Sequence, residues 1–282
     1  MSPGRRRFIA GAVAAAAAAP MRLRAAGTLR FALTPVFLDN DAAVIGRLRD
    51  ALAEGTGMQI ELVQRRTYEE ITGALLEGSV DAAWLCGYPF LQHSHELELL
   101  GVPVWRGQPL YRSYLIVGRD DPAAGLADLR GSSHAFSDPN SNSGYLVTAS
   151  DLIRMGEAPE TFFSRTFFTY GHRNVVRAVA GGLARSGSVD GYVWEALAAV
   201  EPALTEATRI IARSEWLGFP PFAARAGGGE ATAAIGRALR GFSGTESGRA
   251  ALSLLFLDDV IAGSVALFDG IALRMADLAR GP

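Results

Sequence analysis

The stretch from Ser137 to Tyr145 has the residue types of an anion-binding loop. It reads Ser-Asp-Pro-Asn-Ser-Asn-Ser-Gly-Tyr and lies between an expected strand and an expected helix. Ser141 and Ser143 can cap that helix, and Gly144 lets a ligand approach the backbone closely. Free N–H groups at the start of a helix attract negative charge. The loop therefore predicts an anion site, although an ordinary helix cap followed by a turn is also compatible with it.

A histidine follows a second expected strand and should lie at the same edge of the sheet. Gly171-His172-Arg173-Asn174 separates a strand expected over residues 167–170 from a helix expected over 175–185. An imidazole near a helix N-terminus can donate a hydrogen bond to an oxyanion, whereas a single histidine can also be purely structural. Beside a serine-rich anion loop, the sequence favours His172 as a donor.

Three more side chains could complete a small pocket. Asp190, in Val189-Asp190-Gly191-Tyr192, is expected at a strand edge. There its carboxylate could accept from a ligand ammonium group or a neighbouring loop, or simply form a turn. Tyr68 begins a helix, and Tyr88 follows the third expected strand. Both rings are compatible with a pocket wall and with a place in the core.

These residues are not accompanied by the pattern of an enzyme. His93-Ser94-His95 could be a metal pair, but no third ligand has a suitable spacing, and such a pair more often faces solvent. Neither a Gly-x-Ser-x-Gly elbow nor a nucleotide-binding glycine loop is present. Cys86 is the single cysteine, so disulfides within the chain are excluded. We expect binding without catalysis, and neither cofactor nor metal.

Alternating strands and helices must position these side chains. In the first part of the chain, strands are expected over 29–33, 58–63 and 80–85, and helices over 41–54 and 68–77. In the second part, strands are expected over 133–137, 167–170, 189–193 and 208–212, with helices over 145–155 and 175–185 and a short turn over 126–131. The tail is expected to be helical over 231–256 and 268–278. This alternation is typical of βαβ units in α/β proteins.

Two α/β lobes, the second inserted in the first, account for this order. Lobe 1 is expected to comprise residues 27–115 and 214–282, and lobe 2 residues 116–213, with crossings in 111–119 and 210–222. Ligands of such sheets bind at the carboxyl ends of strands and at helix N-termini. We therefore expect the ligand in the cleft between the lobes.

The first 26 residues have the pattern of a secretory signal. Arg5, Arg6 and Arg7 precede an apolar run over 8–19 and small residues that offer cleavage sites. The run is too short to span a bilayer, and residues 5–9 also fit a twin-arginine address. No cysteine follows the run as a lipid acceptor, so we expect a soluble periplasmic protein without a lipid anchor.

Export would also make the chain more acidic. The whole chain has 27 basic and 29 acidic residues, and the first 26 residues hold five Arg and no acid. The remaining chain then has 22 basic and 29 acidic residues, a net charge of about −7. Such a charge argues against nucleic acid and anionic membranes as partners. We expect a monomer.

The chain resembles the phosphate/phosphite/phosphonate-binding proteins of ABC importers, which are type II periplasmic binding proteins. The matching pieces run in the family's order over nearly the whole chain after residue 26: Tyr68-Glu69-Glu70-Ile71, Val80-Asp81-Ala82-Ala83-Trp84-Leu85, the Ser137–Gly144 loop, Gly171-His172, Val189-Asp190-Gly191, Arg213-Ser214 and Pro220-Pro221-Phe222. The resemblance implies the two-lobed type II fold with its ligand cleft, and an ABC permease in the inner membrane as partner.

The resemblance also implies roles for the candidate residues. Ser141, Asn142 and Ser143 would hold the oxygens of a phosphonate-type ligand, with His172 and Tyr68 as further donors. Asp190 matches the position that contacts a substituent such as an amine. The chain departs from the pattern at Asn142, where phosphonate binders often have Thr, and at residue 90, a Phe where they have Tyr.

Two other functions share this fold. Pyrimidine-precursor synthases of thiamine metabolism have it, but they need a cysteine-rich motif and a metal. A ligand-binding partner of a membrane sensor would have it as well, and this chain could serve one only by docking to a separate receptor. The favoured mechanism is capture of a small oxyanion by lobe closure, after which the closed form docks a permease.

Overall fold

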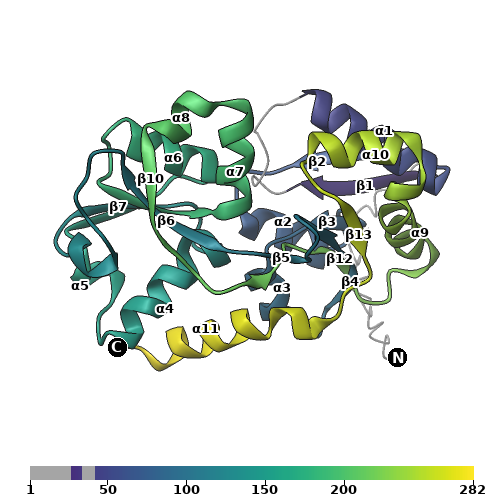
Figure 1. Ribbon diagram of the computed structural model, residues 1–282. Helices are drawn as coiled ribbons and strands as arrows, with labels where there is room; N and C mark the ends of the chain where they lie inside the picture. Colours follow the sequence, from purple (N-terminus) through teal and green to yellow (C-terminus); the bar gives the residue numbers. More distant parts are fainter. Residues whose placement is uncertain (1–26, 34–41) are drawn as a thin grey trace, which may run out of the picture.

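The computed structural model describes residues 27–33 and 42–282 and consists of two α/β units (Figure 1). Each unit is built on its own sheet, one of six strands and one of five. The predicted signal, residues 1–26, lies outside the described residues. In the described part of the chain, no helix has the length and apolar character needed to cross a membrane.

The six-stranded sheet contains the beginning of the chain and strands from its last third. Its order is β13-β4-β12-β3-β1-β2. The strands are β1 (Thr28–Leu33), β2 (Gln59–Gln64), β3 (Ala82–Trp84), β4 (Leu97–Val104), β12 (Phe222–Arg225) and β13 (Asp259–Ile261). β1 runs parallel to β2 and β3, which confirms the three predicted strands. β12 lies antiparallel between β3 and β4, so the chain returns to this sheet after leaving it.

Helices cover this sheet and bury its apolar residues. They are α1 (Ala42–Thr56), α2 (Tyr68–Leu76), α3 (Gly87–Gln92), α9 (Gly229–Arg240) and α10 (Glu246–Leu254). The hydroxyl of Thr67 caps α2 by accepting from the Glu70 N–H at 3.1 Å, which fixes where Tyr68 enters the helix. At the centre, Trp84 packs on Phe222 with ring centroids 4.7 Å apart. This core holds the carboxyl end of β3, from which Cys86 follows.

The five-stranded sheet carries most of the candidate site. Its order is β10-β6-β9-β7-β8. The strands are β6 (Ser113–Gly118), β7 (Ser133–Phe136), β8 (Arg165–Phe168), β9 (Ser186–Asp190) and β10 (Thr208–Arg213), and the helical segments are η1 (Leu126–Leu129), η2 (Asn142–Leu146), α4 (Val147–Arg154), α5 (Pro159–Phe162), α6 (His172–Ala180), α7 (Gly191–Val200) and α8 (Pro202–Glu206). β7 runs parallel to β8 and β9. The loops after β7, β8 and β9 therefore leave the sheet at one edge.

Two predicted elements of this unit need correction. The strand expected over 189–193 is wrong, because β9 ends at Asp190 and α7 begins at Gly191. The Asp190 carboxylate accepts from the N–H groups of Tyr192 and Val193, which ends the strand and caps the helix. The helix expected from 145 begins earlier, with a π-helical turn after Ser141 that continues into α4.

Short strands and the C-terminal helix connect the units. β5 (Leu110–Tyr111) and β11 (Leu217–Gly218) pair antiparallel in the two crossings. The helix α11 (Asp269–Arg280) begins against α3 and continues along α4 (Figure 1). Before it lie two 3₁₀ turns, η3 (Phe242–Gly244) and η4 (Val265–Phe268). The helix expected over 231–256 is therefore divided into α9 and α10 by η3, whereas the one expected over 268–278 corresponds to α11.

The lobe boundaries stay a prediction. The strands show where each of the two boundaries falls in the structure. The first boundary, between residues 115 and 116, falls inside β6, which pairs with β9 from Ser113 onward. The second, between 213 and 214, falls at the end of β10.

Candidate functional site

The seven side chains predicted to bind a ligand are all buried: Tyr68, Tyr88, Ser141, Asn142, Ser143, His172 and Asp190. They come from both units, and hydrogen bonds join the two sides. The Tyr68 N–H donates to Asp138 Oδ2 at 3.2 Å, and the Asn142 N–H donates to Cys86 Sγ at 3.2 Å. The structure thus brings the predicted residues to the junction of the units.

The loop from Ser137 to Gly144 is held by its own side chains. Asp138 Oδ1 accepts from the Asn140 N–H at 2.8 Å, and Ser141 Oγ accepts from the Gly144 N–H at 3.0 Å. The Ser113 hydroxyl donates to the Ser143 carbonyl at 2.6 Å. These bonds fix the conformation of the loop, and the one from Ser141 is the helix cap that was predicted.

Two polar atoms of this loop are buried without a partner in the described residues. They are Ser137 Oγ and Asn142 Oδ1, although the amide nitrogen of Asn142 donates to the Tyr111 hydroxyl at 2.8 Å. Buried polar groups in proteins are nearly always satisfied, so each such exception needs an explanation. A polar ligand at the junction of the units would supply it.

Gly144 lets the loop pack against His172. A Cβ at this position would lie 1.8 Å from Ser137 Oγ and 3.0 Å from His172 Cε1. Any side chain here would therefore collide with the loop and with the ring. The glycine was predicted to allow a close approach to a ligand, and the structure shows a close approach to Ser137.

His172 begins α6, and its two ring nitrogens have different surroundings. Nδ1 accepts the Asp190 N–H at 3.0 Å, so the proton of the neutral ring is on Nε2. Burial lowers the pKa of His172 to about 3, which keeps the ring neutral at ordinary pH. The result is a neutral N–H donor next to the loop.

Asp190 is a buried carboxyl without a cation partner. It accepts from Tyr192 N at 2.8 Å and Val193 N at 3.3 Å, and it takes part in no ion pair among the described residues. Burial raises its pKa to about 7, because desolvation outweighs the two backbone donors. The sequence allowed Asp190 to form a turn. In the structure, its carboxylate caps the N-terminus of α7.

Two tyrosine hydroxyl groups and one cysteine thiol, from other parts of the fold, lie near the Asp190 carboxylate. Tyr68, Tyr111 and Cys86 are buried, and burial raises the pKa of each, that of the Cys86 thiol to about 12. The Asp190 carboxylate is a further cause of the increase in all three. All three therefore lie close enough to Asp190 to feel its charge, and all are neutral at pH 7.

Four residues of this cluster were not predicted as ligand-binding: Cys86, Tyr111, Ser137 and Asp138. Cys86 lies in an apolar stretch that looks like core and Tyr111 begins an expected crossing, so the sequence did not indicate that either faces the loop. Asp138 had a recognisable signal, since Asp-Pro before a serine-rich loop favours a side chain that bonds its own backbone. Tyr88 lies beside Cys86, and burial raises its pKa.

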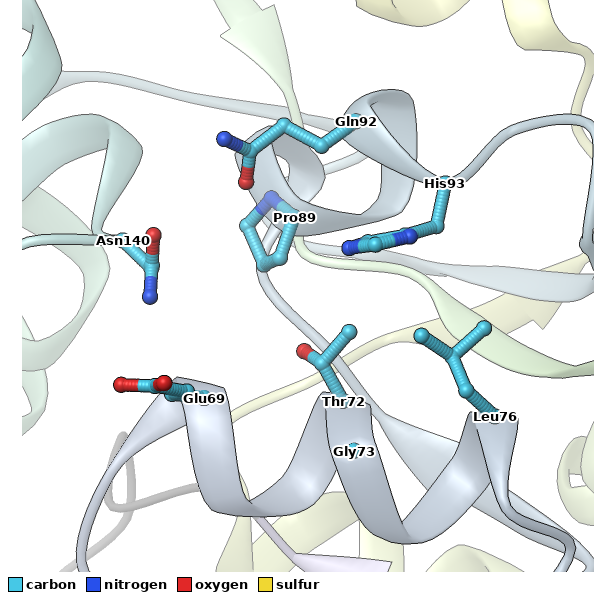
Figure 2. A pocket seen from close by; sticks show the side chains of 8 residues that line it. All are labelled: Glu69, Thr72, Gly73, Leu76, Pro89, Gln92, His93 and Asn140. Atoms are coloured by element: carbon cyan, nitrogen blue, oxygen red, sulfur yellow. The ribbon is translucent and has the colours of Figure 1, made fainter.

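Outside this cluster, a solvent-accessible groove of about 490 Å³ lies between α2 and α3 of the first unit. Its walls come from α2 and α3, with Asn140 from the other unit across from Glu69 (Figure 2). His93, considered as a metal ligand, lines this groove. No group of three His, Cys, Asp or Glu in the described part of the chain is placed to hold a metal ion.

Comparisons with known proteins agree with the geometry. The family model described as ABC transporter, phosphonate, periplasmic substrate-binding protein matches residues 31–267. The phosphate-import protein PhnD of Mycolicibacterium smegmatis is 29% identical over 143 residues, an alignment that covers 46% of this chain and 44% of that relative. This alignment therefore spans less than half of the relative's length.

Solved structures share the whole architecture. A binding protein component of an ABC phosphonate transporter from Pseudomonas aeruginosa superposes with a TM-score of 0.83 at 20% identity, covering 90% of this chain and 87% of the other. PhnD1 of Prochlorococcus marinus, solved in complex with methylphosphonate, gives 0.79 at 14% identity, covering 90% and 98%. At these identities the likeness shows the fold, which is that of two-lobed periplasmic binding proteins.

Proposed function

Because the chain belongs to the family of periplasmic substrate-binding proteins of phosphonate ABC transporters, we propose that it captures a small phosphonate, phosphite or phosphate-like oxyanion between its two lobes. Members of this family are substrate-binding transport components, not enzymes. The observation that carries the proposal is the meeting of buried neutral donors from both units around a loop with two unpartnered polar atoms.

Each residue has a proposed role that follows from its surroundings. Ser141, Asn142 and Ser143 offer hydroxyl, amide and backbone donors to the ligand oxygens, and His172 adds its Nε2–H. Tyr68 donates its hydroxyl from the first unit. Asp190 faces the ligand's substituent, and Tyr88 contributes a wall. Neutral donors can hold an oxyanion without a fixed countercharge, which favours its later release.

Lobe closure is the proposed mechanism of capture. Tyr68 and Cys86 already bond the loop of the other unit through Asp138 and Asn142. A ligand that contacts donors of both units stabilises the arrangement that brings them together, through its greater affinity for that state. The closed form then docks an ABC permease.

The proposed place of action is the periplasm, and the proposed assembly is a monomer. The pattern of residues 1–26 supports export to the periplasm, and a twin-arginine route is compatible with it. Cys86 is internal and buried, which makes it unsuitable as a lipid acceptor. We propose a soluble, monomeric protein that reaches its permease by diffusion.

Removing two hydroxyls tests the site. Ser141→Ala with Ser143→Ala should abolish binding of methylphosphonate, phosphite and phosphate, measured by calorimetry on the exported form. Ser253→Ala on α10, in the other unit, is the control and should bind as wild type. Circular dichroism checks the fold of both variants. Unaltered affinity in the double variant would remove the loop from the site.

A further inference from the structure

The candidate site is built for an anion, yet its own charged groups are acids. Asp138 and Asp190 are both buried at its centre. Each is compensated by two backbone N–H groups and neither is in an ion pair among the described residues. Burial raises the pKa of both carboxyls. A negatively charged ligand would therefore enter a site that already resists negative charge.

The groups that face Asp190 from the neighbouring elements give no cation to offset it. They are Tyr68 from α2, Cys86 before α3, Tyr111 from β5 and Tyr192 on α7 itself, together with His172 from α6, which accepts the Asp190 N–H. His172 stays neutral because burial lowers its pKa to about 3. Arg112 follows Tyr111, but its guanidinium lies over the Trp216 ring, 4.3 Å from the centroid.

A ligand's charge and the Asp190 charge therefore cannot both be present at full strength. Like charges at short range in a buried site force one of the two groups to take up a proton. Phosphonates exchange their second proton in the neutral range, as the phosphoryl group of a phosphorylated side chain does with a pKa of about 6. Asp190 titrates in the same range, so either the ligand or the Asp190 carboxyl can take up the proton.

We propose that Asp190 carries a proton when a simple oxyanion is bound, so that capture is coupled to proton uptake. This rests on the proposed function, because it concerns the binding of that same ligand. The neutral carboxyl can donate its proton to the ligand, which an ionised carboxylate cannot do.

Proton uptake is measured directly by calorimetry of methylphosphonate binding at pH 8 in buffers of different ionisation enthalpy. Wild type should take up about one proton more than Asp190→Asn when both bind the ligand in the same charge state. Asn is a good helix cap, so the variant should retain α7. Asp121→Asn is the control: Asp121 pairs with Arg185, which holds the pKa of that carboxyl low, and its loss should leave the uptake unchanged.

A second probe does not depend on a variant. Methanesulfonate has the shape of methylphosphonate but one charge and no exchangeable proton in this range. If wild type takes up a proton with it, the proton is on the protein, and affinity should fall about tenfold for each pH unit above about 7.

The outcomes separate the two proposals. Two results would overturn the proton-coupled site while leaving the transport function in place. One is equal proton uptake by wild type and Asp190→Asn, and the other is an affinity of wild type for methanesulfonate that rises with pH. No binding of methylphosphonate, phosphite or phosphate at any pH would remove the function and this inference with it.

Discussion

The two ring nitrogens of His172 should serve different purposes, and two substitutions can separate them. Nδ1 accepts the Asp190 N–H at 3.0 Å, which leaves Nε2–H as the donor for a ligand. In His172→Asn the amide oxygen reaches about as far as Nδ1, so it can keep the bond to Asp190 and lose the ligand donor. In His172→Gln the amide N–H₂ reaches about as far as Nε2, so it can keep the ligand donor and lose the bond to Asp190.

The expected magnitudes follow from what each variant leaves unpaired. A hydrogen bond to a charged group contributes about 1.5–3 kcal/mol. His172→Asn should therefore weaken oxyanion binding about 10- to 150-fold, at about 1.4 kcal/mol per factor of ten. His172→Gln leaves the buried Asp190 N–H without its acceptor, which should lower the free energy of unfolding by about 1–3 kcal/mol. Its affinity should fall less than that of the Asn variant.

Calorimetry with methylphosphonate gives the affinities, and urea unfolding followed by circular dichroism gives the stabilities. Affinity decides the role of His172, because a merely structural histidine would lower stability in His172→Gln and affinity in neither variant. If His172→Asn binds as tightly as wild type, the imidazole does not touch the ligand and the assignment of His172 is wrong.

Two further predictions concern the framework around the site. His134 bonds Ser186 and Ser188 in the core, and burial lowers its pKa to about 3. The unfolded chain binds this proton below about pH 6.5 and the folded chain does not, so stability is lost as pH falls from about 6.5 toward 3. His134→Gln should remove about 2 kcal/mol of the difference in unfolding free energy between pH 7.5 and pH 5, and an unchanged difference would contradict a neutral buried ring. Arg274→Met should lower the free energy of unfolding by about 1–3 kcal/mol. This is less than the usual loss for a buried ion pair, because the side chains of Glu215 and Asp151 are 47% and 40% exposed. Arg280→Met, with its side chain 72% exposed, is the control and should unfold as wild type; equal effects would deny that Arg274 ties α11 to α4.

The parallel strands of the first sheet, and β7 and β8 of the second, could be predicted because their signals are local. The first three strands are apolar runs separated by amphipathic helices, and each pairs with a neighbour in the sequence or one strand further on. β12 and β13 could not be predicted in the same way. They have four and three residues, and their partners β3 and β4 lie more than a hundred residues earlier. Their strand character comes from those partners.

The residues of the candidate site also differ in whether the local sequence indicates their role. Loop residues such as Ser141 and His172 are recognisable because caps and histidines at helix starts have local patterns. Asp190 was expected at a strand edge, but its capping of α7 depends on two backbone donors that follow it. Tyr111 and Cys86 face the loop only because the crossings and α3 bring them there. Their roles depend on the packing of the two units against each other.

The contact between Cys86 and Asn142 is compatible with anion binding at the proposed site. The Asn142 N–H sits in the first turn after the Ser141 cap, where backbone donors attract negative charge. Its partner in the structure is the Cys86 sulfur, which is a weak acceptor. A charged oxygen accepts more strongly, so a ligand can displace the sulfur from this donor at small cost. The thiol keeps the donor satisfied and the units together without competing with the ligand. Replacing it with a strong acceptor, as in Cys86→Asp, should therefore weaken oxyanion binding, because the new carboxylate would occupy the donor and add a charge beside Asp190.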